Sequence, residues 1–368
     1  MAPSRRDFLW ASAMAGGAVS LGLNSCSSSN PRSLNILVLG GTSFVGPHQV
    51  QYALDQGHTV TLFNRGRTNT HLFPELEKLI GDRINDLSAL EGRSWDVVID
   101  NSAINPSWVR RSAQLLKDSA GTYLFTSTRS TTSDFTRVGM TALVAPVYST
   151  ESWTEEDEAR MSYGLKKSLA EMEARNAFGD RTLVVRPGLI VGPGDTTDRF
   201  TYWPARLDRG GEVLAPGDPD NPVMFIDVRD LGEWYIHLLE EGVTGTYMGL
   251  GPDYPLTFRG LLEGIRAGIN TNATFTWLDT EFLQENRVRA YSHMPLWMPA
   301  EGSSTGFNRF DLSRIQERGI KYRSLPITAR DTLEYHKSRP EERQGQLRAG
   351  ITAEREAELL TAWHARSG

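Results

Sequence analysis

The sequence is poor in the residues that build disulfides, metal sites and membrane spans. Cys26 is the single cysteine among 368 residues, which excludes an intramolecular disulfide. The seven histidines show no metal-ligand spacing, so we predict no metal. The longest apolar stretch, residues 9–23, is too short and too rich in Gly, Ala and Ser for a comfortable membrane span.

Clustered positive charge is also missing beyond the amino-terminal segment. The net charge is −6, and no run of Lys or Arg follows residue 26. Polyanion binding draws on counterion release by clustered cations, so we expect no nucleic acid partner. With 39% hydrophobic residues, the chain is expected to fold as a soluble globular protein with one large domain or two smaller ones.

The amino terminus carries an export pattern. The sequence SRRDFL at residues 4–9 precedes the apolar stretch, which ends in LNSC at residues 23–26. This segment resembles a twin-arginine signal peptide joined to a lipoprotein box. The resemblance implies export by the twin-arginine route and a lipidated Cys26, with residues 27–33 as a polar tether. We therefore expect a periplasmic or extracytoplasmic protein, lipid-anchored to the cell envelope.

Short apolar runs alternate with stretches of helical length. The runs lie at residues 34–39, 59–63, 96–99, 122–125 and 182–185. Near-continuous apolar runs are typical of strands buried on both faces of a parallel sheet. The alternation predicts an α/β fold with a doubly wound parallel sheet. Pro- and Gly-punctuated sequence at residues 195–222 predicts an insertion on the substrate side, and a strand resumes at residues 225–227.

A glycine-rich turn follows the first expected strand. Gly40, Gly41 and Gly46 would let backbone N–H groups and a helix amino end approach a pyrophosphate, although Ser43 stands where the usual spacing has a middle glycine. The predicted phosphate-binding residues are Gly40, Thr42, Ser43, Phe44, Val45 and Gly46.

The end of the second expected strand bears on the choice of cofactor. Asn64, Arg65 and Arg67 lie there, with no acidic residue to bind an adenosine ribose. Two guanidinium groups suit a phosphate, which favours NADP over NAD. That the two arginines are ordinary solvated loop cations is the open alternative. Asp82, after another short apolar run, is a candidate for an adenine-edge contact.

Tyr163 and Lys167 are four residues apart on an expected helix, so one helix face would carry both. A phenol is a poor base at its reference pKa of about 10, and a nearby ammonium group is expected to lower that pKa. A Tyr four residues before a Lys is also common on solvated helices, so the pair alone does not establish a catalytic site.

Together these motifs resemble the extended short-chain dehydrogenase/reductase family, in its NAD-dependent epimerase/dehydratase branch. The resemblance spans residues 34–239 and includes RPGLIVGPGD at residues 186–195 and FIDVRD at residues 225–230. It implies a Rossmann-type dinucleotide-binding domain at residues 34–194. Residues 195–368 would form mainly a smaller, mixed α/β substrate-binding region, with residues 225–251 returning to the Rossmann domain.

The family resemblance also assigns roles to individual residues. Tyr163 would be the acid/base, Lys167 would hold the nicotinamide ribose, and Thr128 would hydrogen-bond the reacting oxygen, with Ser127 as the competing choice for that hydroxyl. Pro187 joins the cofactor-binding candidates. Family dehydratases carry an Asp-Glu pair directly after this hydroxyl, whereas this chain has Arg129 and Ser130, which disfavours dehydration.

Several side chains are candidates for substrate contacts. Aromatic rings can stack on a sugar and arginines can bind its polar groups, although packing in the core or at the rim is the open alternative for the aromatics. These candidates are Tyr202, Trp203, Trp297, Arg199 and Arg206.

The function that we predict is an NADP- or NAD-dependent sugar epimerase-type oxidoreductase. Its cofactor would be tightly bound and regenerated in each turnover, because free dinucleotide should be scarce outside the cytoplasm. The same location argues for a non-nucleotide sugar or glycoside as substrate. A net NADP-dependent dehydrogenase or reductase is one alternative. The other is a non-catalytic relative, resembling the chloroplast stem-loop RNA-binding members of the family.

Overall fold

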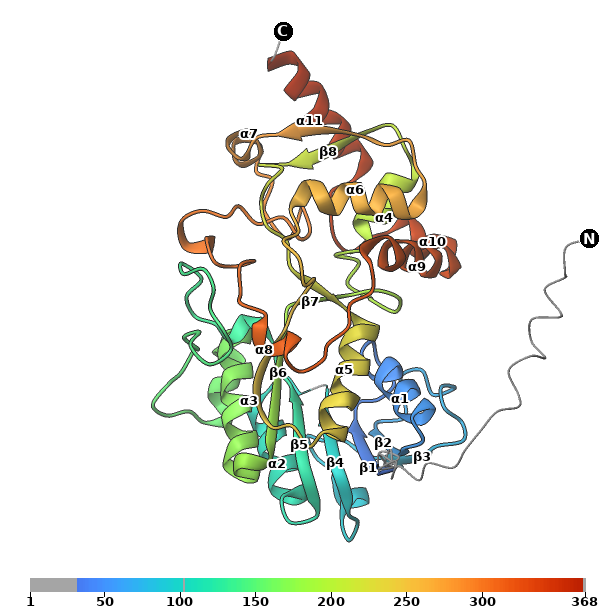
Figure 1. Ribbon diagram of the computed structural model, residues 1–368, viewed down its shortest axis with the longest axis vertical. Helices are drawn as coiled ribbons and strands as arrows, with labels where there is room; N and C mark the ends of the chain where they lie inside the picture. Colours follow the sequence, from blue (N-terminus) through green and yellow to red (C-terminus); the bar gives the residue numbers. More distant parts are fainter. Residues whose placement is uncertain (1–31, 102, 367–368) are drawn as a thin grey trace, which may run out of the picture. The chain divides into compact units, whose positions relative to one another are not determined.

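The centre of the protein is a seven-stranded parallel sheet with the strand order β10-β6-β5-β4-β1-β2-β3. The computed structural model describes residues 32–101 and 103–366. The strands are β1 (Asn35–Leu39), β2 (Thr59–Asn64), β3 (Glu77–Ile80), β4 (Trp95–Asp100), β5 (Ala120–Thr126), β6 (Thr182–Pro187) and β10 (Gly245–Gly249). The expected doubly wound parallel sheet is thus confirmed, and it is Rossmann-type (Figure 1).

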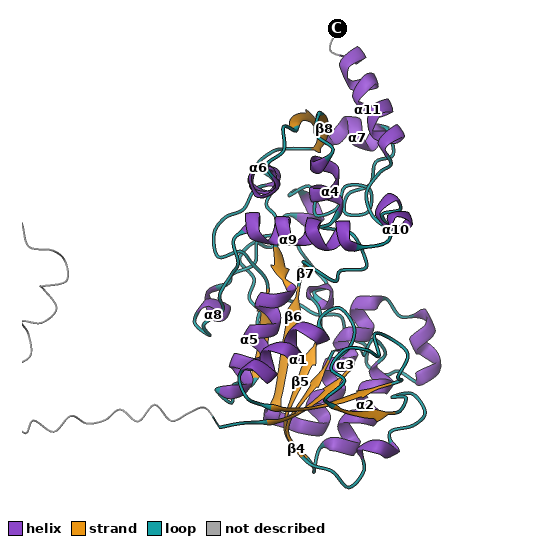
Figure 2. Cartoon of the chain, turned by 90° about the vertical axis from the view of Figure 1, so that its right-hand side faces the viewer, coloured by secondary structure: helices purple, strands orange, loops and turns teal. Residues whose placement is uncertain are grey.

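Helices cover both faces of this sheet (Figure 2). On one face lie α1 (Gly46–Asp55) and α5 (Val228–Glu240), and on the other lie α2 (Pro106–Leu116) and α3 (Tyr163–Phe178). Leu37, Val98 and Phe125 pack on the second face, while Ile36, Val97 and Leu124 pack on the first. Because alternate side chains are buried on opposite faces of the sheet, the strands appear in the sequence as continuous apolar runs.

A second core lies around two short sheets at the other end of the unit that begins at Ser33. The sheets pair β8 (Glu212–Pro216) with β11 (Thr274–Leu278), and β7 (Leu189–Val191) with β9 (Phe225–Asp227). The remaining helices are α4 (Tyr202–Asp208), α6 (Phe258–Ile269), α7 (Thr280–Glu285), α8 (Ser313–Gln316), α9 (Leu325–Ser338), α10 (Glu341–Gly345) and α11 (Ala353–Arg366). The expected insertion at residues 195–222 contains α4 and β8.

The chain returns to the main sheet after this insertion. Residues 225–251 contain β9, α5 and β10, and β10 pairs in parallel with β6 at the edge of the seven-stranded sheet. The division into domains at residue 194 stays a prediction.

The amino-terminal features lie outside the described residues. These are the twin-arginine pattern, the lipoprotein box with Cys26, and most of the polar tether. Within residues 32–101 and 103–366, every helix is too short or too polar to cross a bilayer. The same residues hold no cluster of three or more His, Cys, Asp or Glu side chains that could bind a metal ion.

Candidate active site

A cavity of about 420 Å³ opens at the carboxyl ends of β1, β4, β5 and β6. In doubly wound sheets this edge, at the point where the strand order reverses, is where ligands bind. A second cavity of about 280 Å³ lies beside it, and both are lined by Gly40 and Ser43. The two together follow the sheet edge across the first strand–helix turn.

The glycine-rich turn lets α1 begin close to the end of β1. Gly40 has a φ of +88°, in the left-handed region that favours glycine. A Cβ on Gly46 would lie 2.5 Å from the Gly41 carbonyl carbon, so only glycine lets α1 begin so close to β1. Ser43 lines both cavities despite replacing a glycine. The turn therefore leaves room for a pyrophosphate beside a helix amino end.

The structure brings the predicted cofactor residues to the two cavities. The larger cavity is lined by Gly40, Ser43, Phe44, Val45, Gly46, Lys167 and Pro187. The smaller one is lined by Gly40, Thr42, Ser43, Asn64, Arg65, Arg67 and Asp82. Arg65 and Arg67 are exposed, and Asn64 Oδ1 accepts a hydrogen bond from Gly66 N at 2.8 Å. Two guanidinium groups thus line the smaller cavity, where the sequence predicts the adenosine ribose.

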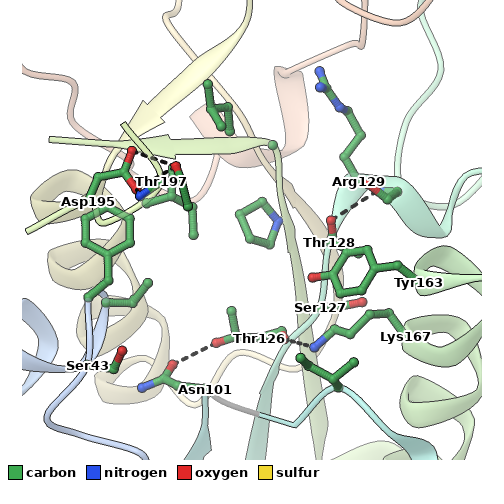
Figure 3. Close-up of a pocket in the computed structure, with 18 of the residues that line it drawn as sticks. Ser43, Asn101, Thr126, Ser127, Thr128, Arg129, Tyr163, Lys167, Asp195 and Thr197 are labelled. Atoms are coloured by element: carbon green, nitrogen blue, oxygen red, sulfur yellow. Dashed lines mark hydrogen bonds between the residues drawn. The ribbon is translucent and has the colours of Figure 1, made fainter. Parts of the chain in front are cut away.

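Tyr163 and Thr128 meet in the larger cavity (Figure 3). Tyr163 is the first residue of α3, whose cap is the Ser162 side chain accepting from Leu165 N at 3.3 Å. A Cβ on Gly164 would lie 2.1 Å from Ser130 O. Because position 164 is glycine, α3 packs tightly against the turn after β5 and holds Tyr163 next to Thr128.

The pKa of Tyr163 differs from the sequence expectation. Tyr163 is half exposed, and its partial burial raises this pKa above its usual value of 10. A hydrogen bond with Thr128 and the charge of Arg199 only partly offset the rise. The expected lowering by Lys167 is wrong in this structure. The phenol of Tyr163 is therefore protonated at neutral pH and stands ready to donate a proton.

Lys167 lies one turn further along α3, where it is almost completely buried. Its Nζ donates to Ala103 O at 2.8 Å and to Thr126 O at 2.6 Å. Burial lowers its pKa to about 7, although Asp100 and Glu171 favour the charged form. The Lys167 ammonium group thus faces backbone carbonyls, which explains why it does not lower the pKa of Tyr163.

The choice between Thr128 and Ser127 follows from their partners. Ser127 Oγ donates to the buried Glu171 Oε1 at 2.5 Å, and Glu171 also accepts from Arg186. Thr128 Oγ1 accepts from Ser130 N at 3.2 Å and lies beside the Tyr163 hydroxyl. The geometry favours Thr128 as the hydroxyl that contacts a reacting oxygen.

The structure adds cavity residues that sequence reasoning missed. Asn101 follows β4, and its Oδ1 accepts from Thr126 Oγ1 at 2.9 Å. A polar residue directly after an apolar run was the available signal. Asp195, Thr197, Tyr291 and Phe307 also line the cavity, and nothing near Tyr291 or Phe307 in the sequence indicates this.

Asp198 anchors the loop that carries Asp195, Thr197 and Arg199. This residue is completely buried with a φ of +59°. Its carboxylate accepts from Arg339 Nη1 at 2.7 Å, from Arg348 N at 2.9 Å and from Arg343. The segment after α9 thereby fixes one wall of the cavity.

The predicted sugar-stacking aromatics lie elsewhere. Tyr202, Trp203 and Trp297 are at most 3% exposed and pack in the second core, so the packing alternative holds for all three. Arg206 is also away from the cavity, in a buried ion pair with Glu356. Among the proposed substrate contacts, only Arg199 lines the cavity.

Comparison with known proteins agrees with this geometry. The model of the NAD dependent epimerase/dehydratase family matches residues 36–251. A dTDP-4-dehydro-6-deoxy-D-allose reductase of Streptomyces bikiniensis is 30% identical over 243 residues, covering 56% of this chain and 73% of the reductase. A reductase of the same name from Streptomyces sp is 29% identical over 245 residues, with the same coverage.

Solved structures share the fold. An enzyme of Bordetella bronchiseptica in complex with NAD⁺ superposes with a TM-score of 0.60 and 16% identity, covering 83% of this chain and 99% of that one. The dTDP-glucose 4,6-dehydratase of Bacillus anthracis in complex with NAD has the same TM-score and identity, covering 84% and 98%. On the family match, this chain belongs to the NAD-dependent epimerase/dehydratase family and is an NAD(P)-dependent enzyme.

Proposed function

We propose that this protein is an epimerase-type oxidoreductase acting on a secondary alcohol of a sugar-like substrate. One observation carries the proposal. A single cavity is lined both by the glycine turn of Gly40 and Gly46 and by Tyr163, Thr128 and Lys167. A substrate carbon in that cavity can therefore lie against an acid/base and a cofactor at once.

The residues have distinct parts in this chemistry. When bound, the nicotinamide group supplies the acceptor and donor of hydride. The Tyr163 hydroxyl gives a proton to the reacting oxygen during reduction and takes it back during oxidation. Thr128 would hydrogen-bond the same oxygen, and Lys167 Nζ, which contacts two backbone carbonyls in this structure, would hold the ribose hydroxyls of the cofactor. Because Tyr163 favours its protonated form, ketone reduction can start from the resting state, whereas alcohol oxidation first requires the phenol to lose its proton to solvent.

The proposed cofactor is NADP, with NAD as the alternative. Arg65 and Arg67 line the adenosine end of the groove, where they can bind a 2′-phosphate. Replacing both by Gln is expected to weaken NADP binding at least tenfold and to leave NAD binding within about twofold. Equal losses for the two cofactors would contradict the role of the arginines.

We further propose that the folded protein is exported with its cofactor and anchored through Cys26. Retention outside the cytoplasm calls for a dissociation constant near nanomolar, roughly −12 kcal/mol of binding free energy. A cofactor that is oxidised and reduced within each turnover needs no exchange. This location supports a free sugar, glycoside or surface glycan as substrate, and Arg129 and Ser130 leave dehydration without its usual acidic pair.

A net reductase is the second candidate. Two observations favour it, namely the protonated resting state of Tyr163 and the two relatives named as reductases of a dehydro sugar. This reading predicts an exchangeable cofactor, because each turnover consumes one reduced dinucleotide.

Native mass spectrometry of the protein from the envelope fraction separates these functions. The epimerase reading predicts one dinucleotide per chain after gel filtration, a diacyl adduct on Cys26, and turnover without added cofactor. Loss of the cofactor on the column, with activity restored only by added NADPH, would establish the reductase instead. An unlipidated chain would contradict the anchor alone.

A further inference from the structure

Arg129 is a buried cation without an acidic partner. It is 4% exposed and lines the larger cavity. Its Nη1 donates to Phe307 O at 3.0 Å and to Asn308 Oδ1 at 2.9 Å, and its Nη2 donates to Tyr291 OH at 3.2 Å. All three acceptors are neutral, and among residues 32–101 and 103–366 no carboxylate forms an ion pair with this guanidinium.

Other buried arginines of the chain are paired. Arg186 contacts Glu171 at 2.7 Å, and Arg206 pairs with Glu356. An arginine cannot release its proton, and burying an ionised group without a counter-charge is unfavourable. The Phe307 ring, whose centroid lies 3.8 Å from Arg129 Cζ, offsets only part of this cost because it carries no net charge. Burial lowers the pKa of Arg129, which records the same cost. An anionic ligand would supply a counter-charge and remove this cost.

The guanidinium lies close to where the chemistry is proposed. A Cβ on Gly188 would be 3.9 Å from Arg129 Cζ, and Gly188 follows Pro187 in the cavity wall. Figure 3 shows the Arg129 side chain extending upwards, away from Thr128 and Tyr163, on the same side of the pocket as both. A ligand that fills the space above Tyr163 would therefore reach it.

A second cation enters the same cavity from another loop. Arg199 lines it, is close enough to act on the pKa of Arg129, and donates through Nε to Thr197 Oγ1 at 3.1 Å. The carboxylate of Asp195 is also in the cavity, where it accepts from Thr197 N at 2.8 Å and from Thr197 Oγ1. Within the described part of the chain, it makes no direct ion pair with either arginine. Burial raises its pKa, and the charge of Arg199 acts in the opposite direction.

We infer that the substrate carries an oxyanion, either a carboxylate or a phosphate ester, which Arg129 and Arg199 bind beside the reacting carbon. The planar fork of a guanidinium matches the oxygens of both groups. The inference rests on the proposed function, since it places the anion on the sugar that Tyr163 acts upon. It makes Arg129 a specificity-determining residue at the position that follows Thr128.

The test uses the cofactor-loaded enzyme and three probes: D-glucuronate, D-glucose 6-phosphate and methyl α-D-glucoside. Binding is measured by titration calorimetry. We expect at least one anionic probe to bind tenfold or more tightly than the neutral glucoside, and the tighter one identifies carboxylate or phosphate. Arg129→Met is expected to remove most of this preference. Arg160→Met, which changes a highly exposed arginine outside the cavity, should leave it unchanged.

Arg129 also contacts Phe307 and Asn308, so its variant can lose the fold. Arg199→Met keeps the test decisive, because this partly exposed side chain lies on a loop, and a several-fold loss of preference is expected. Equal binding of the three probes, or no binding at millimolar concentration, would overturn the inference. A preference that persists in every folded variant would also overturn it.

Failure of the proposed function has a different signature. Tyr163→Phe is expected to bind the anionic probe as the wild type does, while cofactor reduction followed at 340 nm disappears. If the wild type binds the anion and no sugar ever changes the absorbance of the bound cofactor, the oxidoreductase proposal fails. The anion site would then stand by itself.

Discussion

The two walls of the larger cavity are built in different ways. The cofactor wall consists of Gly40, Ser43, Gly46, Asn101 and Lys167, which stand at strand ends or on the helices that follow them. The substrate wall consists of Arg129, Asp195, Thr197, Arg199, Tyr291 and Phe307, which come from segments far apart in the chain. The first wall follows from local backbone geometry, and the second depends on long-range packing.

This difference separates the general features of the site from those that are particular to this chain. The cofactor wall offers glycines, backbone groups and one lysine, which suit a dinucleotide of any family member. The substrate wall offers two arginines and a phenol around Thr128 and Tyr163. Changes in the first wall should therefore affect cofactor retention, and changes in the second should affect substrate choice.

The largest effect is expected from Tyr163, which stands between the two walls. Tyr163→Phe removes the proton donor and should lower the rate of turnover by roughly 10²–10⁴-fold, the usual value of general acid–base catalysis. Thermal unfolding and cofactor content should stay as in the wild type. Tyr254→Phe, at an exposed tyrosine away from this cavity, is the matched control. Retained turnover in Tyr163→Phe would remove the catalytic assignment.

Asp198 tests the support of the substrate wall. Asp198→Asn keeps a residue that tolerates positive φ but leaves Arg339 and Arg343 facing a neutral amide. Breaking a buried pair in this way costs about 3–5 kcal/mol of unfolding free energy. Asp208→Asn, in an exposed pair with Lys337, should cost about 1 kcal/mol or less. Chemical denaturation measures both.

The stabilisation by Asp198 has a defined pH range. Burial opposes its ionisation, but the hydrogen bonds from Arg339, Arg348 and Arg343 prevail and hold its pKa below 3.8. A carboxylate with a lowered pKa stabilises the fold fully above its unfolded pKa. The difference between wild type and Asp198→Asn should be constant at neutral pH and shrink below about pH 4. A difference that does not shrink at all between pH 4 and pH 2 would show that charge is not its cause.

Gly46 tests the cofactor wall. In Gly46→Ala the new methyl group would meet the Gly41 backbone, which cannot move as a side-chain tip can. Overpacking of this kind costs about 1–3 kcal/mol, and the shifted helix end should also release the cofactor. Gly345→Ala, where a Cβ meets nothing within 4 Å, should change neither property. If a folded Gly46→Ala enzyme retained the cofactor, the claim that changes in the cofactor wall affect cofactor retention would be wrong.

Lys167 is expected to give an effect that depends on pH. Its pKa is about 7 in the fold and about 10.4 in the unfolded chain, so the buried charge destabilises the fold fully below pH 7. Between these values the wild type should gain up to about 1.4 kcal/mol of unfolding free energy per pH unit. Lys167→Met should thus be more stable than the wild type at pH 6, with a lead that shrinks towards pH 10.

The control for this titration is Lys166→Met, which changes the neighbouring, partly exposed lysine. It shares the helix and the local sequence but lacks the contacts with Ala103 O and Thr126 O. If both variants follow the same pH dependence, the buried ammonium is not its source.

The fold and, apart from Asn101, the residues of the cofactor wall could be predicted from sequence because their determinants are local. The runs at residues 34–39 and 122–125 correspond to β1 and β5, and the glycine turn follows β1 directly. The placement of Tyr163 and Lys167 on one helix face could be predicted from helix geometry alone. By contrast, the pKa of Tyr163 depends on burial and on Thr128, which spacing along the helix does not reveal.

Apart from Arg199, the substrate wall could not be predicted, since its residues meet only through tertiary packing. Arg129 contacts Tyr291 and Phe307, more than 160 residues away along the chain. Trp203 was expected to stack on a sugar, yet its ring packs edge-on against Phe258 in the second core. An aromatic residue carries the same sequence signal in a core and in a binding site.

Single-turnover absorbance at 340 nm tests the central claim most directly. Cofactor-loaded wild type mixed with its anionic sugar should show reduced dinucleotide that forms and then decays as the product is released with inverted stereochemistry. Tyr163→Phe should show neither phase while binding the sugar equally well. A wild type whose bound cofactor never changes its absorbance, or a Tyr163→Phe enzyme with the wild-type trace, would contradict the account.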